Sequence, residues 1–146
     1  MKTSGAVWIG GILQNPKSQH WHWSRHRKWA AGWREVTAWV CRGLVDAPPE
    51  APKHVRLIAH VRRKFDASNL PMVLSPILDG LQAPRRGKIR RKVDKPTKRL
   101  YSVKSPDWPG AGVIDDDGNP AHRIEFAQVL DRERQGVEVC VQVLAP

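Results

Sequence analysis

The chain has 146 residues, which is enough for one domain with a substantial core but not for two. Its formal net charge is +11, from 25 Lys and Arg against 14 Asp and Glu. Cys41 and Cys140 are too few for a disulfide framework or a zinc site, so we expect both to be reduced. No stretch reads as a membrane span or a signal peptide, which predicts a cytoplasmic protein with no membrane partner.

The N-terminal third predicts a strand followed by a helix. Residues 6–13 are rich in apolar side chains and end at an Asn-Pro turn, which is typical of a strand. Residues 28–42 repeat apolar side chains at helical spacing, Gly43 follows as a stop, and Arg34 and Glu35 are expected to point away from the core. The expected buried face of this helix consists of Trp29, Trp33, Val36 and Val40.

A second strand and a second helix are predicted next. Residues 55–62 alternate between apolar and polar side chains, which indicates a half-buried strand. The helix should begin near Asn69, with Ser68 or Asn69 as its cap, and should end near Leu81. Pro76 removes one of its hydrogen bonds, so we expect a kink or a short, irregular helix. The apolar positions of the strand are Val55, Leu57, Ala59 and Val61.

The C-terminal third predicts two further strands. They cover residues 124–130 and 137–144, and we expect them to form a hairpin around residues 131–136. The order β-α-β-α-β-β is typical of an α+β fold with two layers, a mixed sheet and helices on one face. We therefore predict a single domain over residues 1–146, with a basic, Pro-containing insertion at 83–109 between the second helix and the third strand.

Most of the positive charge lies in this insertion. Residues 84–104 contain ten Lys and Arg against one acid, Asp94, and so carry +9 of the net +11. The insertion has too few apolar side chains to offset the entropy of ordering it, so we expect it to be mobile and to bind a polyanion. The alternative is a small hairpin in which Leu100 and Tyr101 dock on the domain. Nucleic acid is favoured over an anionic membrane as the partner, because no amphipathic apolar face accompanies the basic side chains.

A second basic segment, residues 17–34, mixes three His and four Trp with Lys and Arg and has no acid. One interpretation is a phosphate-contacting surface whose tryptophans stack on unpaired bases. The other is that the tryptophans are buried, which we favour for Trp29 and Trp33. For Trp21 and Trp23 the two interpretations are equally supported. With no Cys or acid nearby, the three histidines do not predict a zinc site.

Two acidic segments interrupt the basic chain. Asp66 follows the predicted strand and shares its segment with Ser68 and Asn69, and residues 115–117 are three consecutive Asp. Each segment alone has an ordinary explanation, as a helix cap or as a turn. If the fold brings the two loops together, clustered carboxylates in a basic protein indicate a divalent metal held against a phosphate.

At these residues the chain resembles the RusA-like Holliday junction resolvases, a family of bacteria and their phages. The matching pieces are Asp-Ala-Ser-Asn-Leu at 66–70, Asp-Gly-Leu at 79–81 and Gly-Val-Ile-Asp-Asp-Asp at 112–117. The resemblance covers most of the chain apart from about 82–109. It implies a homodimeric, Mg²⁺-dependent endonuclease, with Mn²⁺ as a possible substitute, that makes paired nicks in four-way DNA junctions and takes no small-molecule substrate.

The resemblance also implies the roles of particular side chains. It places the catalytic residues and metal ligands at Asp66 and Asp117, with Asp116 beside them. Asp79 or Asp115 is expected to replace a carboxylate that the family has and this chain lacks, and Asp79 is counted among the predicted metal ligands. The chain departs from the family pattern at two positions, where Ser68 replaces a second Asp and Met72 replaces a frequent Lys. Two alternatives therefore stay open: a weakened relative that binds branched or single-stranded DNA without cutting it, and an accessory nucleic-acid-binding protein whose Asp residues only shape turns.

From this resemblance we expect Asp66 and Asp117 to share one metal ion. Because a four-way junction is approximately two-fold symmetric, we also expect an isologous homodimer with both acidic clusters on one face. The predicted DNA-binding side chains are Arg25, Arg27, Lys28, Arg62, Arg63, Lys64, Asn69, Arg85, Arg86, Arg90, Arg91 and Lys92.

Overall fold

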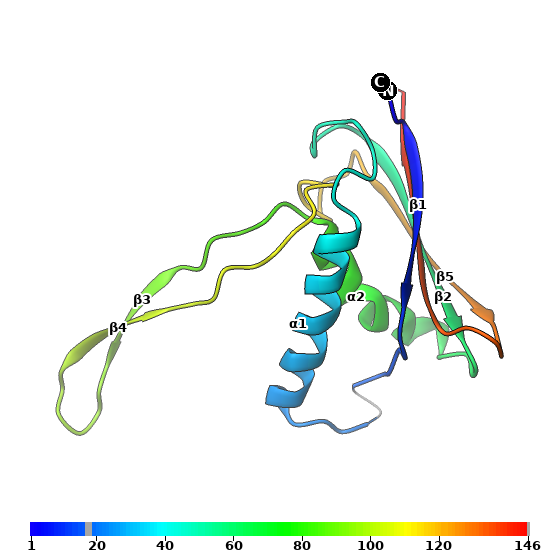
Figure 1. The fold of residues 1–146 in the computed structure, drawn as a ribbon. Coiled ribbons are helices and arrows are strands. Elements are labelled where there is room, and N and C mark those ends of the chain that lie inside the picture. Colours follow the sequence, from blue (N-terminus) through cyan, green and yellow to red (C-terminus); the bar gives the residue numbers. More distant parts are fainter. Residues whose placement is uncertain (17–18, 146) are drawn as a thin grey trace.

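The computed structural model describes residues 1–16 and 19–145, so residues 17–18 of the basic segment 17–34 lie outside the described residues. It contains a four-stranded sheet, two helices, and a separate hairpin (Figure 1). Apart from the hairpin, the order is β-α-β-α-β-β, and the predicted α+β class is confirmed. In chain order the elements are β1 (Ser4–Gly10), α1 (Trp23–Val40), β2 (Lys53–Val61), the 3₁₀ turn η1 (Ala67–Asn69), α2 (Leu70–Leu81), β3 (Ile89–Val93), β4 (Leu100–Lys104), β5 (Arg123–Leu130) and β6 (Gly136–Val143).

The sheet is mixed, as predicted. Its strand order is β1-β6-β2-β5, in which β6 runs antiparallel to both β1 and β2 while β5 runs parallel to β2. Both helices lie on the same face of the sheet (Figure 1), which gives the predicted two layers. The core between the layers contains the alternating positions of β2, all of them buried as expected: Val55, Leu57, Ala59 and Val61.

The predicted hairpin between the last two strands is wrong. β5 and β6 do not pair with each other, because β2 lies between them. The connection crosses the end of β2, where the Asp131 N–H donates to the Val61 carbonyl at 2.9 Å. The reason is burial: Val137, Val139 and Val141 of β6 are at most 2% exposed, so β6 takes an inner position while the more exposed β5 forms an edge.

Helix α1 begins at Trp23, five residues earlier than predicted, and the predicted buried face is partly wrong. Val36 and Val40 are 45% and 42% exposed, whereas Thr37 and Ala38 are fully buried. α2 continues over 12 residues through Pro76, rather than ending early. Neither helix, in the part of the chain that the structure describes, is long and apolar enough to cross a membrane.

The close approach of α1 and α2 explains which side of α1 is buried. A Cβ on Gly80 of α2 would lie 2.7 Å from the Arg34 carbonyl oxygen and 2.7 Å from the Thr37 Cβ, so only glycine permits this contact. The contact turns the face that carries Arg34 and Thr37 toward α2 and leaves Arg34 half-buried instead of solvent-facing. Trp29 and Trp33 are also half-buried, in line with the interpretation favoured for them.

The basic insertion forms a hairpin arm that projects away from the domain (Figure 1). We call residues 83–109 the arm. Every residue of β3 and β4 is exposed, so the segment adds nothing to the core, as predicted. The alternative of a docked hairpin is correct in predicting a hairpin but wrong about the docking, because Leu100 and Tyr101 are 68% and 46% exposed. Isolated two-stranded hairpins are marginally stable in water, so mobility of the free arm stays a prediction.

Candidate metal and nucleic-acid site

The second acidic segment meets the last turn of α2. The carboxyl groups of Asp116 and Asp117 are close enough to perturb each other, and Asp79 lies within electrostatic reach of Asp117. Partial burial, the interaction with the Asp116 carboxyl group and the charges of Asp116 and Asp79 raise the pKa of Asp117. A hydrogen bond from the Gly118 N–H at 3.0 Å is the main cause that lowers the pKa of Asp116, and Arg85 contributes. The pair and Asp79 thus form a locally negative site.

Asp66 lies at the opposite end of α2. Its Oδ1 accepts hydrogen bonds from the Ser68 N–H and hydroxyl, both at 3.0 Å, and these bonds lower its pKa. Asp66 follows the C-terminal end of β2, whereas residues 115–117 precede the N-terminal end of the parallel strand β5. The 12 residues of α2 separate the two ends by about 18 Å. The prediction that Asp66 and Asp117 share one ion is therefore wrong within a single chain.

The basic loop that precedes Asp66 is fixed to the edge of the sheet. The Gln128 side chain accepts from the Phe65 N–H and donates to the Phe65 carbonyl, both at 2.9 Å. Residues 62–64, which were predicted to contact DNA, are exposed beside the Gln128–Phe65 hydrogen bonds. Asn69 is half-buried at the start of α2. This loop belongs to a different end of the molecule from the acidic pair.

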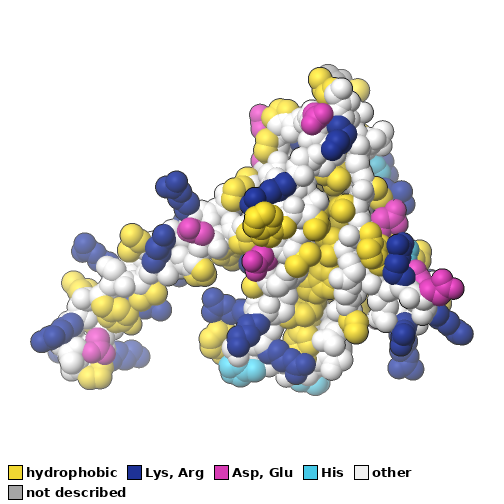
Figure 2. All heavy atoms as spheres, viewed as in Figure 1, with side chains coloured by type: hydrophobic (Ala, Val, Ile, Leu, Met, Phe, Trp, Pro, Cys, Tyr) yellow, Lys and Arg dark blue, Asp and Glu magenta, His cyan; other side chains and the backbone are white. Residues whose placement is uncertain are grey.

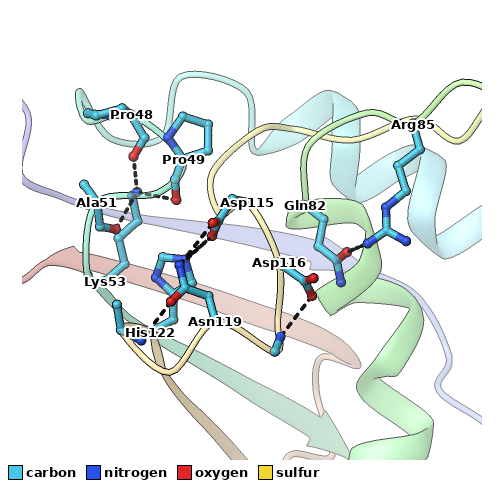
Figure 3. Close-up of polar contacts among 12 residues, drawn as sticks. Pro48, Pro49, Ala51, Lys53, Gln82, Arg85, Asp115, Asp116, Asn119 and His122 are labelled. Atoms are coloured by element: carbon cyan, nitrogen blue, oxygen red, sulfur yellow. Dashed lines mark hydrogen bonds and ion pairs between the residues drawn. The ribbon is translucent and has the colours of Figure 1, made fainter.

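Asp115, the third acid of the run, is engaged in a structural network (Figure 3). Its carboxylate lies 2.6 Å from Nε2 of the buried His122 and accepts from the Asn119 amide at 3.0 and 3.2 Å. These bonds, the one to His122 first, lower the pKa of Asp115 to about 2. Its N–H also donates to the Pro49 carbonyl at 3.2 Å. Asp115 therefore fixes the loop that presents Asp116 and Asp117, a role that the sequence did not indicate.

Lys53 supports the same network from the first residue of β2. Its side chain is fully buried, and Nζ donates to the carbonyls of Pro48 at 2.6 Å, Pro49 at 3.3 Å and Ala51 at 3.0 Å (Figure 3). Burial lowers the pKa of Lys53, and the charge of Asp115 opposes this shift. Lys53 thus holds the proline-rich loop on which the Asp115 backbone rests.

We expect Lys53→Met to lower the free energy of unfolding by about 2–3 kcal/mol, because three carbonyls lose a buried, charged donor while the apolar stem is kept. Urea unfolding at neutral pH measures the change. Lys64→Met, at an exposed position, is the control and should stay within about 0.5 kcal/mol of the wild type. Equal effects of the two substitutions would show that the buried ammonium is not a structural anchor.

The N-terminal turn of α1 presents arginines stacked on aromatic rings. The Arg25 guanidinium lies 4.5 Å from the Trp21 ring centre, and that of Arg27 lies 5.5 Å from the Trp23 ring centre. Trp23 is 64% exposed. Cation–π contact of this kind holds the arginine and tryptophan side chains together at the surface.

The root of the arm is tied to the acidic cluster. Arg85 and Trp108 exchange backbone hydrogen bonds at 3.0 and 2.7 Å, and the Arg85 side chain donates to Gln82 at 2.6 Å. The Arg34 guanidinium lies 3.7 Å from the Trp108 ring centre and 3.4 Å from the Asp79 carboxylate. The arm therefore leaves the domain beside Asp79, the neighbour of the acidic pair.

The arm carries its charges on both faces. Directly paired residues share a face, so Arg90 and Lys92 lie on one side of the hairpin and Arg91 on the other. Figure 2 shows Lys and Arg side chains projecting along the whole arm. A two-stranded β-ribbon fits the major groove of B-DNA. Lys and Arg side chains on both faces of such a ribbon can reach phosphates of both DNA strands.

The donor set suits Mg²⁺. This ion commonly keeps several waters and takes one or two carboxylates together with phosphate oxygens. Asp116 and Asp117 are exposed carboxylates on a loop fixed by the Asp115 network. Within residues 1–16 and 19–145, no group of three or more His, Cys, Asp or Glu side chains is arranged to hold a metal. An ion at this pair would thus complete its coordination with water and substrate.

The fold and the site together define an α+β protein with a basic hairpin arm rooted beside an acidic pair. Comparisons with protein-family models, with curated proteins and with solved structures find no match for this chain.

Proposed function

We propose that this chain is a cytoplasmic, RusA-like, Mg²⁺-dependent endonuclease that cuts branched DNA, in particular four-way junctions. The observation that carries the proposal is the position of the Asp116–Asp117 pair at the root of the basic arm. Polycationic surface attracts the DNA backbone, and a carboxylate pair attracts the cation that polarises a phosphate. Their proximity fits phosphodiester cleavage better than either feature does alone.

Different residues would bind the metal ion, balance the charge of the acidic pair and position the DNA. Asp116 and Asp117 would hold Mg²⁺, with Asp79 adding negative charge nearby, and the bound ion would supply Lewis-acid activation of the phosphate and of a water. Arg85, close enough to lower the pKa of Asp116, would balance the charge of the pair when DNA approaches. The arm would lie along the backbone and fix the register of the duplex relative to the acidic pair.

The test is cleavage of a synthetic four-way junction by the purified chain in Mg²⁺ or Mn²⁺. Paired nicks near the branch point, absent from a linear duplex of the same sequence and abolished by EDTA, would support the proposal. Tight binding without nicks in either metal would contradict the cleavage step.

A second candidate, a junction-binding protein that does not cut, has a specific observation in its favour. Asp66 precedes the first turn of α2 whereas Asp79 lies in its last turn, and Ser68 binds Asp66 instead of supplying a second carboxylate. This candidate predicts junction affinity that is indifferent to Mg²⁺. Calorimetric titration of the free protein with Mn²⁺ separates the candidates, because only the first requires a metal site.

We expect the protein to be a homodimer through α1 and β1. A shallow groove of about 320 Å³ there is lined by Ile9, Trp29, Trp33 and Val36, of which Val36 is 45% exposed. Exposed apolar surface of this kind favours an isologous contact. Sedimentation velocity should show dimers for the wild type, monomers for Val36→Asp, and dimers for Val129→Asp on the distant edge strand. A wild-type monomer, both free and on junction DNA, would contradict this prediction.

A further inference from the structure

We propose that the groove between α1 and the root of the arm binds an unstacked nucleotide of single-stranded DNA. The proposal rests on the proposed function for the class of ligand, DNA, and assigns to this groove the recognition of unpaired bases. The groove has a volume of about 710 Å³, within the range of about 300–1,000 Å³ that is typical of small-ligand sites. Its lining includes Trp39 of α1 and, from the arm, Arg85, Arg86 and Trp108.

Two exposed tryptophans supply the stacking surface. Trp39 is 66% exposed and Trp108 is 41% exposed, although tryptophan normally buries most of its surface. Figure 2 shows hydrophobic side chains gathered where α1 meets the arm, with both basic and acidic side chains beside them. Stacking of one base on an aromatic side chain contributes about 1–3 kcal/mol and tolerates any base, because every base has a π face.

Trp108 is held in position before any ligand arrives. The Arg34 guanidinium packs against its ring at 3.7 Å, and Arg34 is itself only half-buried and paired with Asp79 at 3.4 Å. The backbone of Trp108 is bound on both sides to Arg85. A ring fixed in this way loses little conformational entropy when a base stacks on it, which strengthens binding.

The charges of the groove suit a nucleotide with its phosphate. Arg85 and Arg86 lie on the arm side, where guanidinium groups bind phosphate oxygens. Two acids also line the groove. Asp107 accepts from the Gly87 N–H at 2.7 Å and lies 4.0 Å from Lys104, so it is committed to the arm. Glu35 is exposed, and solvent screens its charge.

The groove and the acidic pair share a side chain. Arg34 packs under Trp108 in the groove and pairs with Asp79 in the last turn of α2. The same turn is hydrogen-bonded through the Leu81 carbonyl to the segment that leads into Asp116 and Asp117. A nucleotide stacked in the groove would therefore place a neighbouring phosphate toward Asp116 and Asp117. Branch points and nicks offer unstacked nucleotides that a continuous duplex lacks. The groove would therefore select branched DNA by binding the unpaired nucleotides at the branch.

The experiment measures affinity for a short labelled oligothymidine and for a blunt duplex by fluorescence anisotropy, in EDTA so that no cleavage occurs. Trp39→Ala should weaken oligothymidine binding by about 5- to 150-fold, the equivalent of about 1–3 kcal/mol, and change duplex affinity less than about twofold. Trp39→Phe, which keeps an aromatic face, should restore most of the loss. Val40→Ala, at the next and also exposed position of α1, is the matched control and should bind both ligands like the wild type.

Each outcome decides between the proposals. Equal effects of Trp39→Ala and Val40→Ala, or an equal loss on duplex and oligothymidine, would overturn the groove while leaving junction cleavage as a separate question. Wild-type protein that binds no DNA of any kind would overturn both the groove and the proposed function. Oligothymidine binding that depends on Trp39, in a protein that fails to cut junctions, would support the groove and refute only the cleavage.

Discussion

Asp117→Asn should abolish junction cleavage and leave junction binding unchanged or tighter. The substitution removes a metal ligand at nearly constant volume, and the activation that a bound ion supplies is worth several kcal/mol, so the rate should fall by about three orders of magnitude. Binding should not weaken, because a negative charge that repels phosphate has been removed. Initial rates at saturating Mg²⁺, with anisotropy in EDTA, measure the two effects separately.

Asp66→Asn locates the site. Unchanged cleavage by this variant would assign the chemistry to the Asp116–Asp117 pair alone, whereas a loss as severe as that of Asp117→Asn would require Asp66 of a second protomer to complete the site. Glu133→Gln, in the exposed connection after β5, is the control and should cut like the wild type. Wild-type rates for Asp117→Asn would refute the acidic pair as the metal site.

Local periodicity in the sequence was sufficient to predict the two helices and the four strands of the main sheet. The alternation of Val55, Leu57, Ala59 and Val61 identifies β2 and its buried face, because a strand buried on one side needs an apolar residue at every second position. The β5–β6 pairing failed for a physical reason. Adjacency in sequence predicts a hairpin, but Val137 and Val139 gain more burial beside β2 than β5 could provide.

The candidate site was only partly predictable for a similar reason. The run of acids marked Asp116 and Asp117, the resemblance to the resolvases gave them and Asp79 a role, and the structure brings the three near one another. The contacts of Arg34 with Trp108 and of His122 with Asp115 join residues that are not neighbours in any periodic pattern. Such contacts depend on how the helices cross and where the arm leaves, which no local signal encodes. His122 offered one hint, as a histidine shortly after three consecutive Asp.

The hairpin was only the alternative prediction because its stabilisation is local. The arm has few apolar side chains, which correctly predicts that it stays out of the core. Cross-strand pairs such as Val93 with Leu100 and Lys92 with Tyr101 bring together side chains that favour strands. The sequence-based prediction compared the entropy cost of ordering the arm with burial of its side chains against the domain. That comparison leaves out the stabilisation from cross-strand pairs within the arm.

Deletion of residues 86–107 should leave the fold intact and flatten the salt dependence of DNA binding. The backbones of Arg85 and Trp108 are already hydrogen-bonded across the root, so an Asn-Gly turn can join them without strain. β3 and β4 are exposed throughout, and the melting temperature should therefore hardly change. Each lost phosphate contact removes about 0.9 from the slope of log affinity against log salt, so four contacts would flatten it by about 3.6.

A second variant separates the charge of the arm from its shape. Replacing Arg90, Arg91 and Lys92 by Gln keeps the hairpin length and removes three exposed cations. If the arm follows the DNA backbone, this variant should lose up to about 2.7 of the slope, with a loss of junction affinity that shrinks as salt is raised. If the arm acts by its shape alone, the slope stays that of the wild type. An unchanged slope in both variants would refute the assignment of the arm to DNA, and so would unfolding of the deletion variant. If the basic side chains of the arm contact phosphates, their removal must lower the number of counterions released on binding.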